Sequence, residues 1–315
     1  SPLEGVGFTY NWEQLDSGQI TSDNFGPNNV IGGMARSLPP KSISNRTIPN
    51  IQNILSNNLT LENPGVGDSW ETVSMVERDL NWGLTVRKNI GDQVKLSQDK
   101  MKVSVIATSS PFAVTSQDSN QLIWKGGSYQ SIAWNIAETN LQPINVKEVE
   151  ILLSSDGGIN FDIQLADRVP NKGEAVIYVP NNIDTNNARL MVKAKEGIFF
   201  ALNRTAFAIE SRQFALNFNN HQKNNCDSND IQFDFDIVRK NGFESSFSIQ
   251  SVDLPNGVEA VFSKSIYTSI DVNGSIILKG LNYLNKSNKF DTITTISKFN
   301  NFSPVRAKKI IDLSK

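Results

Sequence analysis

The stretch that decides the fold is VKEVEILLSSDGGINFDIQLAD, residues 146–167. Two runs rich in apolar residues flank SSDGGINF (154–161), which carries Asp156, Gly157 and Gly158. Glycine tolerates positive φ, and an Asp side chain can accept hydrogen bonds from backbone amides across a turn. The stretch therefore predicts a tight β-hairpin, with Phe161 packed back under the turn.

The same turn also allows two chemical interpretations. Its spacing, Ser-x-Asp-x-Gly-x-x-aromatic, is that of the Asp-box of sialidases, and short Asp-Gly-Gly turns can hold calcium. A sialidase-like propeller repeats the box at blade-length intervals, whereas the sequence contains it once and shows no arginine clusters. We interpret Asp156 as a structural turn residue, with a ligand or calcium loop and a propeller remnant as alternatives.

The hairpin pattern continues along most of the chain. Runs of four to eight residues rich in Val, Ile, Thr and Phe alternate with clusters of Gly, Asn, Asp and Pro, and helical periodicity is nearly absent. Seven or eight such runs in roughly 100 residues indicate a β-sandwich. The predicted fold class is all-β: tandem Ig-like or fibronectin-III-like β-sandwiches, with a short helix in the first domain.

Two short joints divide this pattern into three predicted domains. TSSPF around Pro111 ends the first domain, and IESRQF around Ser211 ends the second. Short joints favour domains that are strung out with small interfaces. We expect an irregular segment plus a first β-sandwich in residues 1–109, an Ig-like sandwich in 110–210 and another in 211–315.

The first predicted domain is the least regular. The candidate helix runs from Ile48 to Asn58, where Pro49 suits a first turn and the apolar residues fall on one face. The Gly-, Pro- and Asn-rich segment before it is expected to be a large insertion, held by this helix. The expected strands of this domain are residues 70–76, 80–89 and 101–108.

Strand alternation predicts part of the core of the second domain. In YQSIAWNI (129–136), Ile132 and Trp134 share one face with Gln130 and Ile136, because successive side chains alternate sides. Trp134 is the largest member of this face. Its burial is expected to stabilise the domain by about 2–3 kcal/mol.

Composition excludes several classes of function. The chain has 315 residues, 38% of them hydrophobic, and a net charge of −2. It therefore lacks the basic field that favours nucleic acid or anionic lipid, and no apolar run approaches the length of a membrane span. The opening residues SPLEGVGFTYNW have no charged start and no apolar signal core, which suits an excised fragment.

Histidine and cysteine are almost absent. His221 and Cys226 are the only ones, and both lie in the polar segment NNHQKNNCDSND (219–230). A zinc site usually needs several such ligands, and nucleophilic triads need a histidine near the nucleophile. A catalytic Cys226–His221 pair stays a minor alternative. We predict no catalytic, cofactor-binding or metal-binding residues and no cofactor.

An acidic segment, CDSNDIQFDFD (226–236), offers oxygen ligands of the kind that calcium prefers. It lacks the Gly and the later Glu of an EF-hand loop. Phe and Asp alternate in residues 233–236, which is typical of the solvent face of an edge strand. We therefore interpret its acidic residues as a solvated face rather than a metal site: Asp227, Asp230, Asp234 and Asp236.

Exposed aromatic residues that bind carbohydrate are a further alternative. Trp124 comes just before KGG and is the best candidate for a sheet end. The other tryptophans are Trp12, Trp70, Trp82 and Trp134. All but Trp12 lie on strand candidates, where a core role is expected. Glycoside hydrolysis by two carboxylates is also an alternative, but the sequence gives no way to place such a pair.

The order of several segments resembles a known family. YNWEQLDSG (10–18), MARSLPP (34–40) and RDLNWGLTVRKN (78–89) are followed by WKGGSYQSIAWNIAETN (124–140) and then by the 146–167 stretch. This order resembles the region after the catalytic domain in secreted reprolysin-like zinc metalloproteases of marine Bacteroidetes. Two further segments are similar to the Ig-like repeats that often follow there: LPNGVEAVFS (254–263) and GSIILKGL (274–281).

This resemblance implies a non-catalytic role. The catalytic signature of that family, His-Glu-x-x-His-x-x-Gly-x-x-His, is absent because His221 is the only histidine. The zinc and the general-base glutamate of the family therefore carry over to no position here. The resemblance also implies a bacterial protein that is secreted or at the cell surface, similar to cargo of a type IX secretion route, with the parent catalytic domain upstream.

The expected function is that of an accessory region of an exported metalloprotease. It would act as a spacer and take part in binding substrate or the cell surface, with protein or glycan as partner. We expect no nucleic-acid partner and no membrane span. The alternative is an adhesin-like cell-surface or carbohydrate-binding protein.

Overall fold

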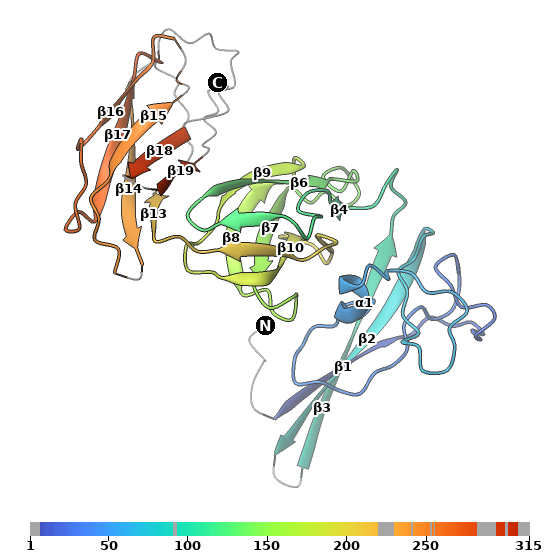
Figure 1. Ribbon diagram of the computed structural model, residues 1–315. Helices are drawn as coiled ribbons and strands as arrows, with labels where there is room; N and C mark the ends of the chain where they lie inside the picture. The colour runs from blue at the N-terminus through green and yellow to red at the C-terminus, as the bar shows by residue number, and fades with distance from the viewer. Residues whose placement is uncertain are drawn as a thin grey trace. The chain divides into compact units, whose positions relative to one another are not determined.

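The computed structural model describes residues 7–90, 93–219, 230–240, 242–252, 254, 256–281, 294–299 and 302–307. These residues form nineteen β-strands and one helix of five residues (Figure 1). The all-β prediction is therefore confirmed. Within the described part of the chain, no helix has the length and apolar character needed to cross a membrane. The chain divides into two compact units, residues 1–111 and 112–315.

The N-terminal unit contains one antiparallel sheet with strand order β1-β2-β3. Strand β1 (Phe8–Gln14) pairs with the middle of β2 (Arg78–Ile90), and β3 (Gln93–Val105) pairs with the whole of β2. Because directly paired residues share a face, Tyr10, Val86 and Ser97 lie on the same side of the sheet. That side also carries Trp82, which is buried.

Irregular chain, rather than a second sheet, provides most of the layer against this sheet. It runs from residue 15 to residue 77 and includes helix α1 (Ile51–Leu55), with Phe25, Met34 and Ala35 buried. A complete sandwich was expected here. The predicted strand at 70–76 is not a strand, because Glu71 makes only an isolated bridge to Ala35.

A buried ion pair connects this layer to the sheet. Arg46 donates to the carbonyl of Trp12 at 2.6 Å and to the Glu71 carboxylate at 2.6 Å. The second Glu71 oxygen accepts from the N–H of Asn50 at 2.8 Å. Asn50 also caps α1, since its side chain accepts from the Asn53 N–H. Pro49 therefore precedes the helix cap and does not lie in the first turn as predicted.

The middle lobe, residues 112–210, is a sandwich of two sheets. The larger sheet has the order β5-β12-β10-β7-β8, with β11 also paired to β10: β5 (Ile123–Lys125), β7 (Glu148–Ser154), β8 (Ile163–Pro170), β10 (Thr185–Ala194), β11 (Phe200–Leu202) and β12 (Phe207–Glu210). The smaller sheet has the order β4-β6-β9: β4 (Ala113–Val114), β6 (Tyr129–Asn135) and β9 (Glu174–Tyr178).

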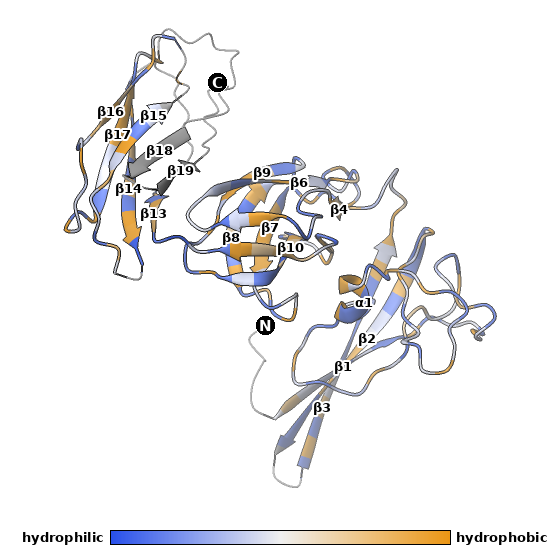
Figure 2. Cartoon of the chain, viewed as in Figure 1, coloured by the Kyte–Doolittle hydropathy of each residue, from blue (hydrophilic) through white to orange (hydrophobic). Residues whose placement is uncertain are grey.

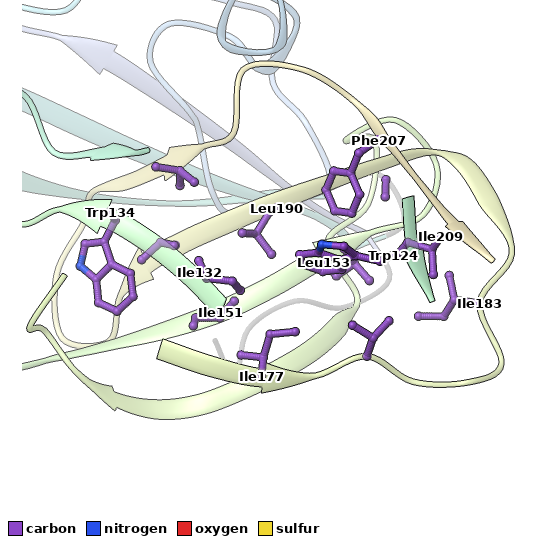
Figure 3. Packing of buried hydrophobic residues seen from close by; sticks show 14 of the residues in the cluster. Trp124, Ile132, Trp134, Ile151, Leu153, Ile177, Ile183, Leu190, Phe207 and Ile209 are labelled. Atoms are coloured by element: carbon purple, nitrogen blue, oxygen red, sulfur yellow. The ribbon is translucent and has the colours of Figure 1, made fainter. Parts of the chain in front are cut away.

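The core of the middle lobe takes residues from both sheets. Ile132 and Trp134 of β6 are buried as predicted, together with Ile151 of β7 and Leu190 of β10. Figure 3 shows Trp134 at one end of this core and Trp124 further along it, beside Leu153. Hydrophobic residues continue along β7 and β10 (Figure 2). This core holds the two sheets face to face, as the sandwich prediction requires.

The C-terminal lobe, residues 211–307, contains two further sheets. One has the order β13-β14-β17-β16: β13 (Phe214–Phe218), β14 (Ile231–Arg239), β16 (Glu259–Phe262) and β17 (Asn273–Lys279). The other has the order β15-β18-β19: β15 (Ser248–Val252), β18 (Thr294–Phe299) and β19 (Phe302–Ala307). Phe233, Phe235, Tyr267 and Leu278 are the most deeply buried residues of its core, each at most 1% exposed.

Candidate functional site

The Asp-box segment is a turn that its own hydrogen bonds close. Asp156 Oδ1 accepts from the Ser154 hydroxyl at 2.6 Å and from the backbone N–H groups of Ile159 and Asn160 at 3.0 Å each. Asp156 Oδ2 accepts from the Asn160 side chain at 2.8 Å. Gly157 has a φ of 84°, as the turn prediction requires. Both carboxylate oxygens are thus engaged within the turn.

These bonds also explain the acidity of Asp156. The Asn160 backbone N–H and then the Ser154 hydroxyl stabilise the carboxylate, and together they lower the pKa of Asp156 to about 2. The turn is further tied to β10, because the Gly157 N–H donates to the Asn187 carbonyl at 2.8 Å. The prediction that Asp156 bonds backbone amides across the turn is confirmed.

Trp124 is buried in the core, as expected for a tryptophan on a strand, so the alternative of a sugar-binding residue at a sheet end is wrong. It is 1% exposed, and its ring centroid lies 4.6 Å from that of Phe207. Trp82 and Trp134 are buried as well, and Trp12 and Trp70 are half-buried. The tryptophans therefore do not form an exposed platform.

The acidic segment of the C-terminal lobe shows the predicted alternation in its described part. Phe233 and Phe235 are each 1% exposed, and Asp234 and Asp236 are exposed on the opposite face. The edge-strand interpretation is wrong, because β14 lies between β13 and β17. Sequence alternation reveals an exposed face but not which strands flank it.

Several predicted residues fall outside the described part of the chain: His221, Cys226 and Asp227. Asp230 is described and exposed. Among the described residues, no group of three or more His, Cys, Asp or Glu side chains is placed to hold a metal ion.

A set of polar, close and aromatic contacts joins the middle and C-terminal lobes. We call it the junction: Gly126, Gly127, Tyr129, Tyr178, Asn181, Arg212, Ala215 and Phe218. Strand β12 ends at Glu210 and β13 begins at Phe214, so three residues connect the lobes. The backbone N–H of Gly126 donates to the Glu210 carbonyl at 2.8 Å. The connection is thus fixed to the middle lobe where it begins.

Asn181 clamps the connecting residues. Its side-chain amide donates to the Arg212 carbonyl at 2.8 Å, and its side-chain oxygen accepts from the Arg212 N–H at 2.6 Å. Asn181 is only 5% exposed, so both bonds are largely shielded from water. Asp184 adds a bond from the Ser211 N–H at 2.7 Å. The Ser211 hydroxyl and then this N–H lower the pKa of Asp184.

Glycine is required where the lobes meet most closely. A Cβ at Gly127 would lie 2.1 Å from the Cβ of Ala215, and Gly127 has a φ of +72°. A Cβ at Gly126 would lie 2.6 Å from Oδ1 of Asn181. Both the backbone conformation and the space therefore exclude larger residues at Gly127.

Aromatic packing completes the junction. The Tyr129 ring lies 5.4 Å from that of Tyr178 and 6.4 Å from that of Phe218, measured between ring centroids. Tyr129, Val176 and Tyr178 of the middle lobe belong to the hydrophobic cluster of the C-terminal lobe. Their burial raises the pKa of the Tyr129 hydroxyl, and it raises the pKa of Tyr178 to about 12.

Sequence reasoning missed this junction. Alternation placed Tyr129 on the face opposite the core, and the short joint at Ser211 indicated only a small interface. The available signals were the paired glycines after Trp124 and the polar Asn181 directly after a strand and Pro180. Those signals indicate a backbone constraint but do not name the neighbour that imposes it.

Comparisons with known proteins add the following findings. No protein-family model and no curated protein sequence matches the chain. Among solved structures, it is similar to the I-band fragment I67–I69 from titin, with 11% identity and a TM-score of 0.21, over 98% of this chain and 89% of that one. It is also similar to a protein of unknown function from Porphyromonas gingivalis W83, with 12% identity and a TM-score of 0.23, over 65% of this chain and 100% of that one. Neither similarity assigns a residue role or an activity to this chain.

Proposed function

We propose that this chain is a non-catalytic accessory region of an exported bacterial protein, and that residues 112–307 act as a rigid spacer. The single observation that supports the spacer role is the junction. A flexible tether between two domains does not need buried polar side chains that hold its backbone. It also does not need glycine at positions where a neighbouring side chain leaves no room for a Cβ. Here Asn181 holds Arg212 in place, and Ala215 occupies the space beside Gly127.

The resemblance to the region downstream of the catalytic domain in reprolysin-like metalloproteases suggests the context. Residues that carry this resemblance also build the fold: Gln14 accepts hydrogen bonds from the backbone of Met34 and Ala35 at 2.7 and 3.0 Å. In the proposal, the chain sets the distance between a catalytic domain and other parts of an exported protease, at or outside the cell surface. Protein or glycan at that surface is the proposed partner.

Trypsin cleavage after Arg212 tests the spacer role. In the full chain, we expect slow appearance of the fragment that begins at Gln213, because Asn181 shields this peptide segment. Removing two largely shielded hydrogen bonds with Asn181→Ala should open the segment and speed this cleavage at least about tenfold. Asn182→Ala, at the exposed neighbouring position, is the matched control. Fast cleavage of the wild-type chain after Arg212 would contradict a rigid spacer.

A protease assay tests the non-catalytic part of the proposal. The purified chain should not hydrolyse casein, with or without added zinc. Hydrolysis that a zinc chelator abolishes would refute this part and leave the spacer test unaffected.

A further inference from the structure

The outer edge of β3 is a long exposed strand edge in the described part of the chain. Residues 93–102 of this strand are all exposed, and β3 lies at the end of the strand order β1-β2-β3. The opposite edge differs, because Tyr10 of β1 exchanges two backbone hydrogen bonds with Lys41, at 2.7 and 2.9 Å. One edge of the sheet is therefore partly covered, and no described strand pairs with the other.

Hydrogen bonding identifies which residues of β3 face the open side. The Asn81 N–H donates to the Asp16 carboxylate, and the Asn81 carbonyl accepts from Leu15, so both backbone groups of Asn81 point away from β3. Asn81 pairs with Lys102, and backbone direction alternates along an antiparallel ladder. The open side thus carries the backbone groups of the even-numbered residues: Val94, Leu96, Gln98, Lys100, Lys102 and Ser104. The Lys100 N–H agrees with this, since it donates to the Asp99 side chain at 2.8 Å.

This edge is also basic, although the whole chain is slightly acidic. Strand β3 carries three lysines and one acidic residue, and one of the lysines, Lys102, pairs with Asp79 of β2 at 3.0 Å. Lys88 and Lys95 face each other directly across β2 and β3, and like charges in this position are destabilising. An acidic side chain on a strand next to β3 would relieve that repulsion at Lys95.

We propose that β3 is a docking edge for an extended, acidic segment of a partner protein, which adds to the sheet as a fourth strand. Exposed strand edges bind extended peptides through main-chain hydrogen bonds, and the side chains provide selectivity. Val94 and Leu96, 62% and 56% exposed, offer apolar contacts to the partner. A second copy of this chain is disfavoured, because two basic β3 edges would repel one another. This inference is independent of the spacer role.

Binding of designed peptides to the full chain tests the proposal. The probe is the acidic peptide Glu-Val-Thr-Val-Glu-Val-Thr, and its control carries Lys in place of each Glu. By fluorescence anisotropy, we expect the acidic peptide to bind at least about tenfold more tightly. By hydrogen exchange, its binding should protect the amides of Leu96, Gln98 and Lys102 in β3.

Two variants separate strand addition from simple charge attraction. Gln98→Pro removes one outward N–H while leaving the bonds from Ser97 and Asp99 to β2, so it should weaken acidic-peptide binding about tenfold. Gln98→Ala is the control and should bind like the wild type. Lys95→Glu with Lys100→Glu should shift preference to the lysine peptide, which keeps the test valid if the proline variant misfolds.

Any of four results would overturn the proposal. They are no binding of the acidic peptide, binding without amide protection in β3, equal binding by flexible polyglutamate, or self-association that protects the same amides. Absence of binding would mean that the edge does not take an acidic peptide. Binding without amide protection, or equal binding by polyglutamate, would indicate charge attraction alone. Self-association that protects these amides would show that the edge binds a second copy of the chain.

Discussion

At Gly127, backbone conformation and packing impose the same requirement. A φ of +72° disfavours side chains, and Ala215 occupies the space where a Cβ would lie. Asp156 is a contrasting case, because its role comes from acceptor capacity rather than from size. Four hydrogen bonds converge on its carboxylate from three residues of the same turn. Position 127 thus requires a residue without a Cβ, and position 156 requires a side chain with acceptor oxygens. Substitutions can test both requirements.

Gly127→Ala should destabilise the chain more than an alanine at a glycine with free space. Gly157 provides that control, since its φ is +84° but the nearest atom to an added Cβ is 4.0 Å away. Positive φ costs about 1 kcal/mol in either case, and overpacking against Ala215 adds about 1–3 kcal/mol at Gly127 only. Urea unfolding of each variant measures the difference. Equal losses would mean that the two lobes do not meet at Gly127.

Asp156 should give the middle lobe an acid-sensitive contribution to stability. Its folded pKa of about 2 lies below the value of about 3.9 for an unfolded Asp. The contribution is therefore complete above pH 4 and is lost as the pH falls toward 2. Asp156→Asn should be less stable than the wild type at pH 6, and this gap should close between pH 4 and pH 2. Urea unfolding across this range measures it, and a gap that does not change with pH would contradict the assignment.

At the scale of elements, β5 and its parallel neighbour β12 close one end of the middle lobe. Trp124 of β5 points into the core, whereas Ile123 next to it is 47% exposed. Trp124→Ala should therefore destabilise the chain by about 3–5 kcal/mol, because it leaves a cavity beside Phe207. Ile123→Ala should change stability by no more than about 0.5 kcal/mol. If urea unfolding showed a similarly small loss of stability for both variants, Trp124 would not be a core residue.

The irregular layer of the N-terminal unit depends on a polar link. Glu71 is 1% exposed and bonds both Arg46 and the Asn50 backbone. Glu71→Ala should cost about 3–5 kcal/mol, since it leaves the Arg46 charge buried and unpaired. Glu62→Ala, at an exposed position, is the control. Equal thermal stability of the two variants would show that the layer does not depend on this link.

Sequence patterns predicted the elements that form from signals between residues close together in the sequence. The 146–167 hairpin and the core face of β6 followed from alternation and turn residues, because those signals lie within about twenty residues. The segment around Glu71 looked like a strand, but Arg46, 25 residues away, fixes it by side-chain bonds. Tyr129 was expected on the solvent side, and the C-terminal lobe covers it. Neither long-range contact leaves a periodic signal in the sequence.

At the scale of the whole molecule, the proposed spacer role depends on how the middle and C-terminal lobes are held. Three connecting residues, the Asn181 clamp and the aromatic contacts of Tyr129 together leave little freedom at the junction. In the proposed spacer, these contacts give the two lobes one fixed separation. That separation is what a spacer between functional domains must provide.

Pulsed EPR distances between the two lobes test this claim most directly. Spin labels are placed on cysteines at Ile159 and Ile270, which are 72% and 85% exposed, in a full chain that carries Cys226→Ser. A rigid junction should give one narrow distance distribution, which broadens when Asn181→Ala is combined with Gly127→Val. A broad distribution in the chain with an intact junction would contradict it.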